Sequence, residues 1–308
     1  MHYSSNGKLL ITGEYIVLDG AKALAIPTKF GQSLEVFSLG EPIIQWKSLD
    51  ENNQVWFECE LVSGSLQLIN SSFYTDDENA QENTAETLQS ILMEAQKLNP
   101  NFLADKKGFQ VTTKLTFPRN WGLGSSSTLI NNIANWAKVD AYKLLKSTFG
   151  GSGYDIACAQ NNHPITYQLI DKKPMVAEVN FNPIFKNQLY FIYLNKKQNS
   201  REGIAQYKNF KGEKSSVIEE ISTITKDILN TQTMLDFEKL IAAHEQIISK
   251  IIHQKPIQQE YFSDYFGQIK SLGAWGGDFI LASGNDDTPN YFINKGYKTV
   301  VPFQEMIK

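Results

Sequence analysis

The segment 118–128 (PRNWGLGSSST) combines residue types that bind phosphate. Gly122 and Gly124 would let main-chain N–H groups approach an anion closely, and a helix N-terminus would add aligned amides. Serine hydroxyls at 125–127 could donate to phosphate oxygens or complete the oxygen shell of Mg²⁺. The segment is not a Walker loop, which needs a Lys-Ser/Thr pair, nor a dinucleotide fingerprint, which needs a third glycine. The alternative is a tight turn with a serine-rich helix cap, and the segment alone does not decide between the two.

Three charged residues stand beside other glycines. Asp155 follows a Gly-Ser-Gly run, where a carboxylate could accept a proton from an alcohol or bind a metal; the alternative is a helix-capping aspartate. Lys8 could neutralise a transferring phosphoryl group, and its alternative is an exposed lysine at a strand start. Glu14 follows Gly13 at the far end of the same strand, and its alternative is a solvated turn residue.

The three glycine clusters together favour one chemistry. Phosphoryl transfer needs a phosphate cradle, a metal, a cation and a group that positions the acceptor. The third cluster, 273–278 (GAWGGD), adds another carboxylate, Asp278. The residue types at the three clusters meet all of these needs, so the combination favours phosphoryl transfer over three unrelated turns.

Hydrophobic periodicity predicts the elements that carry these clusters and indicates a mixed α and β fold. Strands are expected at 9–11, 33–37, 55–61, 109–117, 165–169, 189–194 and 279–282. A helix capped by Asn83, with Glu86 three residues on, should present Leu88, Ile91, Leu92 and Ala95 as its apolar stripe. Further helices are expected from Leu129 to Ala137, after Asp155, and at 215–230, 234–252 and 257–271. Every glycine cluster then lies at a junction between elements.

Composition excludes several classes of protein. The 308 residues carry a net charge of −4, which gives no electrostatic case for nucleic acid or a membrane surface as partner. The two cysteines, Cys59 and Cys158, lack metal-ligand spacing, and the four histidines are scattered. Without a signal peptide or an apolar spanning stretch, we expect a cytoplasmic protein. The polar segment 171–183, which contains two prolines, predicts a domain boundary, with domains 1–175 and 176–308.

The sequence resembles the GHMP kinases, the family of galactokinase, homoserine kinase, mevalonate kinase and phosphomevalonate kinase. All three family motifs occur in order, at 7–15, 118–128 and 273–278, and they span most of the chain. The resemblance implies an α+β fold of two domains. The N-terminal ATP-binding domain would resemble a fold of ribosomal protein S5, and the C-terminal domain would be ferredoxin-like.

The resemblance also assigns roles to single residues. It implies ATP and Mg²⁺ as cofactors, a small-molecule substrate, and a monomer or homodimer. Asp155 would be the catalytic aspartate and Lys8 its electrostatic partner. The residues implied to hold the ATP phosphates are Gly122, Leu123, Gly124, Ser125, Ser126 and Ser127, with Ser126 also the metal contact. The residues implied to bind substrate are Glu14, Tyr15, Gly153, Gly276, Gly277 and Asp278.

Within the family, 13–20 (GEYIVLDG) and 151–157 (GSGYDIA) resemble the mevalonate branch. Tyr15, the Gly-Ser-Gly-Tyr-Asp run and Asp278 lean towards phosphomevalonate kinase. The implied activity is transfer of the ATP γ-phosphoryl group to mevalonate or 5-phosphomevalonate, a step of isoprenoid precursor synthesis. Two alternatives stay open: a non-catalytic metabolite-binding protein on the same scaffold, and a diphosphomevalonate decarboxylase, which the Gly-Ser-Gly-Tyr-Asp run favours less.

The chain departs from the family pattern in three ways. Trp275 stands where the third motif usually has glycine. The segment 127–150 is shorter than usual by about one helix of ordinary length. Near Leu144, where many relatives carry a glutamate as second metal ligand, there is no carboxylate. The shortened segment and Trp275 motivate the non-catalytic alternative.

Overall fold

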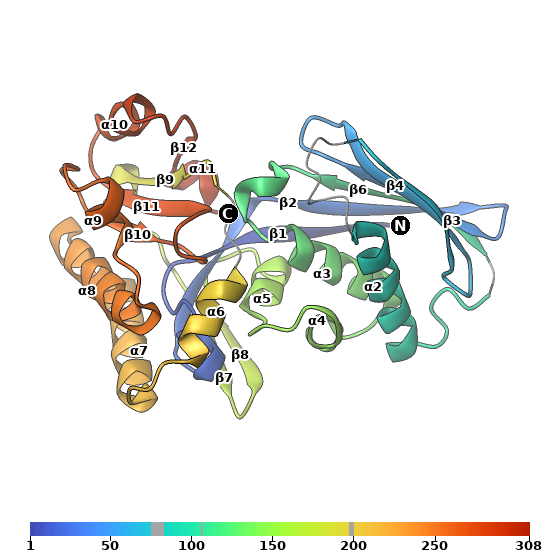
Figure 1. The fold of residues 1–308 in the computed structure, drawn as a ribbon, viewed down its shortest axis with the longest axis horizontal. Coiled ribbons are helices and arrows are strands. Elements are labelled where there is room, and N and C mark those ends of the chain that lie inside the picture. The colour runs from blue at the N-terminus through green and yellow to red at the C-terminus, as the bar shows by residue number, and fades with distance from the viewer. Residues whose placement is uncertain (75–82, 106, 197–199) are drawn as a thin grey trace. The chain divides into compact units, whose positions relative to one another are not determined.

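The computed structural model describes residues 1–74, 83–105, 107–196 and 200–308 (Figure 1). The chain divides into two compact units. Unit 1 comprises 1–7, 30–119 and 123–160, and unit 2 comprises 8–29, 120–122 and 161–308. The predicted domain boundary at 175/176 stays a prediction.

The sheet of unit 1 runs in the order β5 (Leu68–Phe73), β4 (Val55–Val62), β3 (Ile43–Leu49), β6 (Gly108–Leu115) and the C-terminal part of β2 (Ala23–Leu39). β3 and β6 are parallel, and the other pairs are antiparallel. The predicted alternation of 55–61 is confirmed, because Phe57, Cys59 and Leu61 are buried while their neighbours are partly exposed. One face of the sheet is therefore the core face.

Helices cover that face. They are α2 (Thr84–Leu98), α3 (Ser125–Ala137), α4 (Ala141–Thr148) and α5 (Tyr154–Gln160). Figure 1 shows α2, α3 and α4 on one side of the sheet. The predicted stripe of α2 is buried in the core. The predicted cap is wrong: Asn83 has φ 73° and its side chain makes no capping hydrogen bond, because a capping side chain needs an extended backbone.

In unit 2 the N-terminal part of β2 pairs with β7 (Ile165–Ile170), which pairs with β8 (Lys173–Glu178). β1 (His2–Leu10), which begins in unit 1 and ends in unit 2, also pairs with β2. β8 lies within the polar segment 171–183, which was predicted to be a domain boundary. Its side chains are mostly exposed because it is the edge strand of its sheet, and this exposure accounts for the polar sequence.

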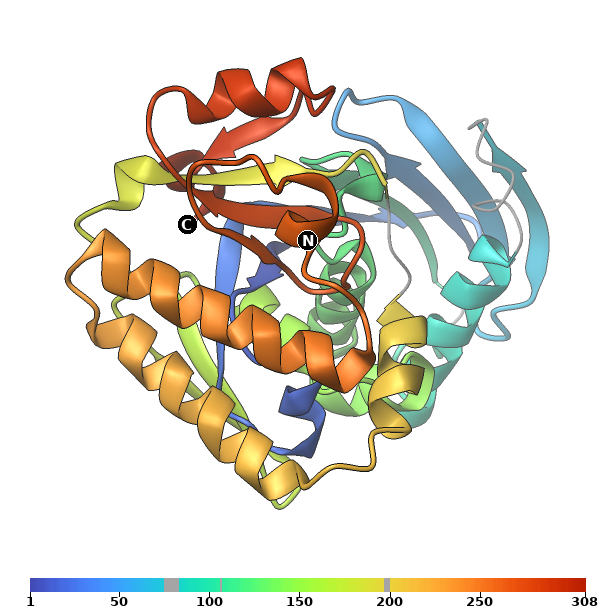
Figure 2. The ribbon, with the colours of Figure 1, turned by 60° about the vertical axis from the view of Figure 1, so that its left-hand side comes forward.

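Unit 2 has a second, antiparallel sheet in the order β10 (Ile269–Ser271), β11 (Phe279–Ser283), β9 (Leu189–Tyr193) and β12 (Val300–Pro302). Figure 2 shows α7 (Lys214–Asn230) and α8 (Met234–Ile252) side by side below this sheet. The shorter helices are η1 (Ile16–Asp19), η2 (Arg119–Trp121), η3 (Lys186–Gln188), α6 (Ser200–Lys208), α9 (Ile257–Tyr261), α10 (Thr288–Asn294) and α11 (Phe303–Met306).

The predicted helix 257–271 is wrong beyond Tyr261. Residues 269–271 form β10 and pair with β11, and all three are buried. Strand pairing in the core outweighs the local helical pattern here. The predicted helices 215–230 and 234–252 are confirmed, as is the mixed α+β class. Within the described ranges, no helix has the length and apolarity to cross a bilayer.

Candidate active site

The phosphate-loop candidate has the predicted order of strand, glycine turn and helix: β6, then η2, then α3. Gly122 and Gly124 have φ 68° and 92°, conformations that favour glycine. Gly124 is the N-cap of α3, and no side chain caps the helix. The serines therefore occupy its first turn rather than its cap, so the serine-cap alternative is wrong. The turn presents main-chain N–H groups and the positive end of the helix dipole, as a phosphate site requires.

The side chains of this loop divide into two kinds. Leu123 is fully buried, and the buried Ser127 hydroxyl donates to the Gly124 carbonyl at 3.0 Å. These two residues fix the loop from inside. Ser126 is exposed and Ser125 is half-buried, so their hydroxyls are the ones that solvent can reach. The predicted contacts of these residues with ATP stay predictions.

Asp155 lies in the first turn of α5 and is half-buried. Its Oδ1 accepts a hydrogen bond from the Ile156 N–H at 3.0 Å. The preceding Gly153 is buried at φ 91°. The Gln160 amide at the other end of α5 donates to Asn131 Oδ1 at 2.9 Å, and this ties α5 to α3. Asp155 and the phosphate-loop helix thus belong to one packed pair of helices.

Lys8 lies near the end of β1 and is half-buried, so the alternative of an exposed lysine at a strand start is wrong. Its electrostatic partnership with Asp155 stays a prediction.

The structure brings the second and third motifs together at Gly122 and Asp278. A Cβ on Gly122 would lie 2.3 Å from the Asp278 carboxyl group, so only glycine fits. Asp278 itself has φ 53°, and its N–H donates to the Lys196 carbonyl at 2.7 Å. A non-glycine residue held in this conformation marks a backbone that its surroundings determine.

Aromatic packing fixes the segment before Gly122. The Trp121 ring lies 5.4 Å from Phe279 in an edge-on contact and 6.3 Å from Tyr193. Burial, and then the Asp278 charge, raise the pKa of Tyr193. Trp121 is thus anchored on β9 and β11, next to the glycine that contacts Asp278.

Tyr15 of the first motif meets the third motif. Its φ and ψ are 63° and −45°, and the Ile16 N–H donates to the Glu14 carbonyl at 2.7 Å, which makes a γ-turn of the rare, strained hand. The Trp275 N–H donates to Tyr15 Oη at 3.1 Å. A Cβ on Gly203 would lie 2.3 Å from that oxygen, so the ring packs directly against α6.

The packing of Trp275 explains the departure from glycine at this position. Its side chain is buried in a hydrophobic cluster with Tyr15, Ile16 and Ile248. The indole therefore fills the core of unit 2. Beyond it, Gly276 is exposed at φ 89° and Gly277 is buried, and their predicted contacts with substrate stay predictions.

Sequence reasoning missed the partners of Glu14. Glu14, His244, Glu245 and Lys270 form a buried polar cluster in which Glu14 and Lys270 make a hydrogen-bonded ion pair. The solvated-turn alternative for Glu14 is therefore wrong, and its contact with substrate stays a prediction. A signal was present: His244 and Glu245 fall on the stripe of α8 that also buries Ile241 and Ile248.

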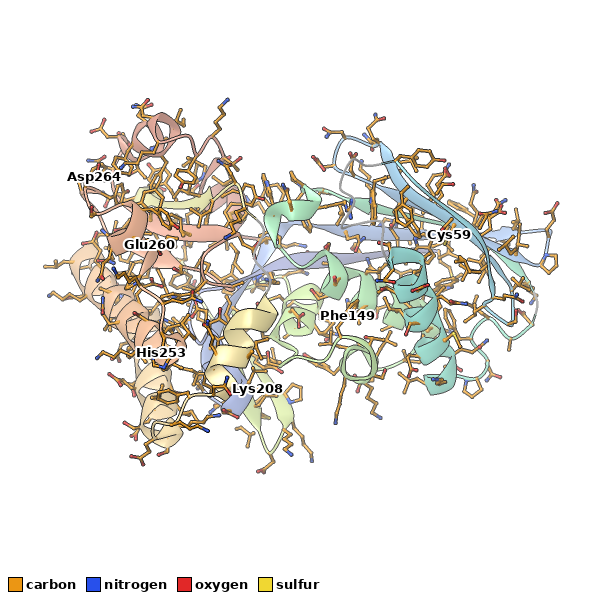
Figure 3. The ribbon with its side chains drawn as sticks, viewed as in Figure 1. Cys59, Phe149, Lys208, His253, Glu260 and Asp264 are labelled. Atoms are coloured by element: carbon orange, nitrogen blue, oxygen red, sulfur yellow. The ribbon has the colours of Figure 1, made fainter. Side chains whose placement is uncertain are left out.

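The two cysteines are not exposed to solvent. Cys59 on β4 (Figure 3) and Cys158 on α5 are both buried and free of disulfides. Burial raises the pKa of the Cys59 thiol to about 12, so it is not a nucleophile at neutral pH.

The predicted Mg²⁺ contact of Ser126 stays a prediction, and the residues around it can be compared with what this ion requires. In the ranges that the structure describes, no group of three or more His, Cys, Asp or Glu could hold a metal ion. Mg²⁺ usually takes one or two protein oxygens together with substrate phosphates and water. The exposed Ser126 hydroxyl on the first turn of α3 meets that need, whereas Leu144, at the place of the family's second ligand, is fully buried.

The similarity of this chain to known proteins is found in its structure. No family model and no curated protein matches the sequence. Solved structures do match. Mevalonate kinase of Methanococcus jannaschii has a TM-score of 0.70 at 18% identity, covering 96% of this chain and 94% of that one.

Two further matches are kinases of other substrates. Streptococcus pneumoniae phosphomevalonate kinase, in complex with phosphomevalonate and AMPPNP, has a TM-score of 0.66 at 15% identity, covering 96% and 95% of the two chains. Lactococcus lactis galactokinase with galactose has a TM-score of 0.64 at 11% identity, covering 100% and 92%. Such coverage across kinases of unlike substrates defines the architecture: this chain has the α+β fold of the GHMP kinases.

Proposed function

We propose that the protein is an ATP-dependent small-molecule kinase that transfers the γ-phosphoryl group to mevalonate or 5-phosphomevalonate. One observation carries the proposal: an uncapped helix N-terminus with an exposed serine directly follows two left-handed glycines. On a fold shared with phosphotransferases, that arrangement is suited to nucleotide phosphates.

The chemistry assigns distinct work to each residue. The acceptor oxygen forms a new bond to the γ-phosphorus as the bond from that phosphorus to the ADP oxygen breaks. For the alcohol of mevalonate, Asp155 accepts the departing proton, whereas the phosphate of 5-phosphomevalonate can attack as its dianion. Lys8 and the first-turn amides of α3 stabilise charge on the transferred group. Ser126 would hold Mg²⁺ together with the nucleotide, and the ion would supply charge that neutralises the phosphates.

The residues of the first, Asp155-containing and third motifs support the choice of acceptor. The Gly-Glu-Tyr and Gly-Ser-Gly-Tyr-Asp runs resemble the mevalonate branch, and Asp278 favours the phosphomevalonate member. Trp275, which had motivated the non-catalytic alternative, packs into the core and leaves the loop at 276–278 free of its bulk. The kinase is therefore preferred over the non-catalytic binder.

An ADP-release assay tests the proposal. Purified protein with Mg²⁺ and ATP would be offered mevalonate, 5-phosphomevalonate, diphosphomevalonate, galactose and homoserine. We expect turnover with one of the first two. Activity only with galactose or homoserine would reject the acceptor and keep the kinase, and release of carbon dioxide from diphosphomevalonate would identify a decarboxylase. ATP binding without turnover on any acceptor would favour the non-catalytic alternative.

A further inference from the structure

The γ-turn at Tyr15 needs support from its surroundings. A bulky residue at φ 63° is an outlier, and such strain persists only where neighbouring structure over-determines it. The two residues before it are both held from outside the turn. The Gly13 N–H donates to His244 Nε2 at 2.9 Å, and the Glu14 carboxylate pairs with the Lys270 ammonium.

The same polar cluster also holds the approach to the third motif. Glu245 Oε1 accepts from the Ser271 N–H at 2.8 Å, and its Oε2 lies 3.3 Å from the Ser271 hydroxyl. Lys270 Nζ donates to the Ser271 carbonyl at 2.8 Å. Of these two adjacent residues of α8, His244 therefore bonds to the backbone of the first motif, and Glu245 bonds to the backbone of β10, two residues before the third motif.

The charges of the cluster balance around one ammonium. His244 accepts a main-chain N–H at Nε2, and burial, together with Lys270, lowers its pKa well below 6.5, so it is neutral. Glu14 contacts Lys270 Nζ directly, whereas Glu245 Oε1 lies 3.8 Å away. Burial raises the pKa of Glu245 to about 8, with Lys270 offsetting part of that rise and Glu14 adding to it. A proton on Glu245 leaves the cluster with no net charge.

We propose that this buried polar cluster sets the conformations of the first and third glycine motifs, and that His244 and Glu245 are its positioning residues. The inference rests on the proposed function, because the motifs it positions are the ones proposed to bind acceptor and phosphate. His244 and Glu245 accept main-chain N–H groups at Gly13, directly before Glu14 and Tyr15, and at Ser271, two residues before the third motif.

His244 gives the sharpest test, because two uncharged substitutions there differ in whether they leave a hydrogen-bond acceptor for the Gly13 N–H. His244→Leu removes the acceptor for the Gly13 N–H, whereas His244→Gln keeps an acceptor of similar reach. Ser222→Ala is the matched control: Ser222 on α7 accepts the Lys22 N–H at 2.9 Å, outside the three motifs. Residue-resolved amide exchange of the ligand-free protein is measured at 13–16, at Lys22 and in β9, and KM and kcat are measured for the better of mevalonate and 5-phosphomevalonate.

We expect His244→Leu to speed exchange at 13–16 by about tenfold, the loss of roughly one hydrogen bond, with β9 unchanged. KM for the acceptor should rise more than kcat falls, and His244→Gln should stay within about threefold of wild type on both readouts. Ser222→Ala should speed exchange at Lys22 alone and leave KM unchanged.

The outcomes separate this inference from the proposed function. Uniformly faster exchange that includes β9, no change at 13–16, or equal effects of Leu and Gln at 244 would overturn the positioning role, whatever the turnover. Selective exchange at 13–16 in a protein that turns over no acceptor would keep the positioning role and reject the kinase.

Discussion

Two regions next to glycine motifs use polar residues in opposite ways. At the start of α3 no side chain caps the helix, and Ser126 is exposed. In the buried polar cluster, Glu14 and Lys270 have no exposed side-chain surface and pair with each other. The start of α3 is arranged to bind a ligand, whereas the polar groups of the cluster are already paired within the protein. A motif residue that looks chemically active can therefore belong to either group, and burial decides which.

The largest expected effect is on kcat, and it comes from substituting the proposed catalytic residue Asp155. Asp155→Asn should lower kcat by about 10²- to 10⁴-fold, because the amide cannot accept the acceptor's proton. Thermal unfolding should change little. Asp140→Asn is the control: it replaces another helix-start aspartate of unit 1, whose cap to the Tyr142 N–H an asparagine can keep. Equal losses in both variants would remove Asp155 from the reacting groups.

The substitution Lys270→Met tests the buried polar cluster. The Glu14 carboxylate then loses its buried cation, and the free energy of unfolding should fall by about 3–5 kcal/mol in urea titrations. Adding Glu14→Gln removes the unpaired charge and should recover most of that loss. Lys295, which pairs with Asp264 at 2.8 Å on the surface, is the control, and Lys295→Met should cost less than about 1 kcal/mol. Similar costs for the two lysines would mean that the cluster is not buried as described.

Gly122 tests the contact between the second and third motifs. Gly122→Ala adds a methyl group 2.3 Å from the Asp278 carboxyl group at φ 68°. Gly150→Ala adds one at φ 70° with nothing within 4 Å, so it shares the backbone strain without the clash. The control should lose about 1 kcal/mol of stability. Gly122→Ala should lose more and also weaken ATP binding in calorimetry; equal losses would argue against close packing at Asp278.

The proton on Glu245 predicts a pH dependence. The folded protein keeps this proton up to about pH 8, while an ordinary glutamate loses it near 4.5. Between these values the folded state binds more protons, so stability falls as pH rises, by about 1.4 kcal/mol per pH unit for this group. Glu245→Gln removes the effect. Its stability relative to wild type should therefore increase from pH 5 to pH 8 in chemical denaturation, and a constant difference would contradict the assignment.

The smallest effect distinguishes two neighbouring serines. Ser127→Ala removes the bond to the Gly124 carbonyl and should cost about 1 kcal/mol of stability. Ser126→Ala removes an exposed hydroxyl, so stability should hold while the Mg²⁺ concentration needed for half-maximal binding of AMPPNP rises a fewfold. A stability loss at Ser126, or an unchanged Mg²⁺ requirement, would place the metal contact elsewhere.

Much of the fold could be predicted because single elements show their periodicity. The apolar stripe of α2 and the alternation of β4 were both readable along the chain. β10 could not be predicted, because a strand of three residues is too short to show an alternation of apolar and polar side chains. It forms only by pairing with the distant segment Phe279–Ser283. Within the candidate site, sequence found Gly122 and Asp278 but not their contact, which depends on where Trp121 packs. Lys270 was missed because it lay inside the wrongly predicted helix.

Both cysteines of the chain belong to unit 1, and both are buried. A thiol reagent such as Ellman's therefore finds no target while unit 1 stays closed, and unit 2 contributes no signal at any stage. The rate of thiol labelling therefore reports the rate at which unit 1 opens in the unmodified protein. A ligand that binds the start of α3 should slow the labelling, so the affinity of the protein for that ligand can be measured before any acceptor substrate is known.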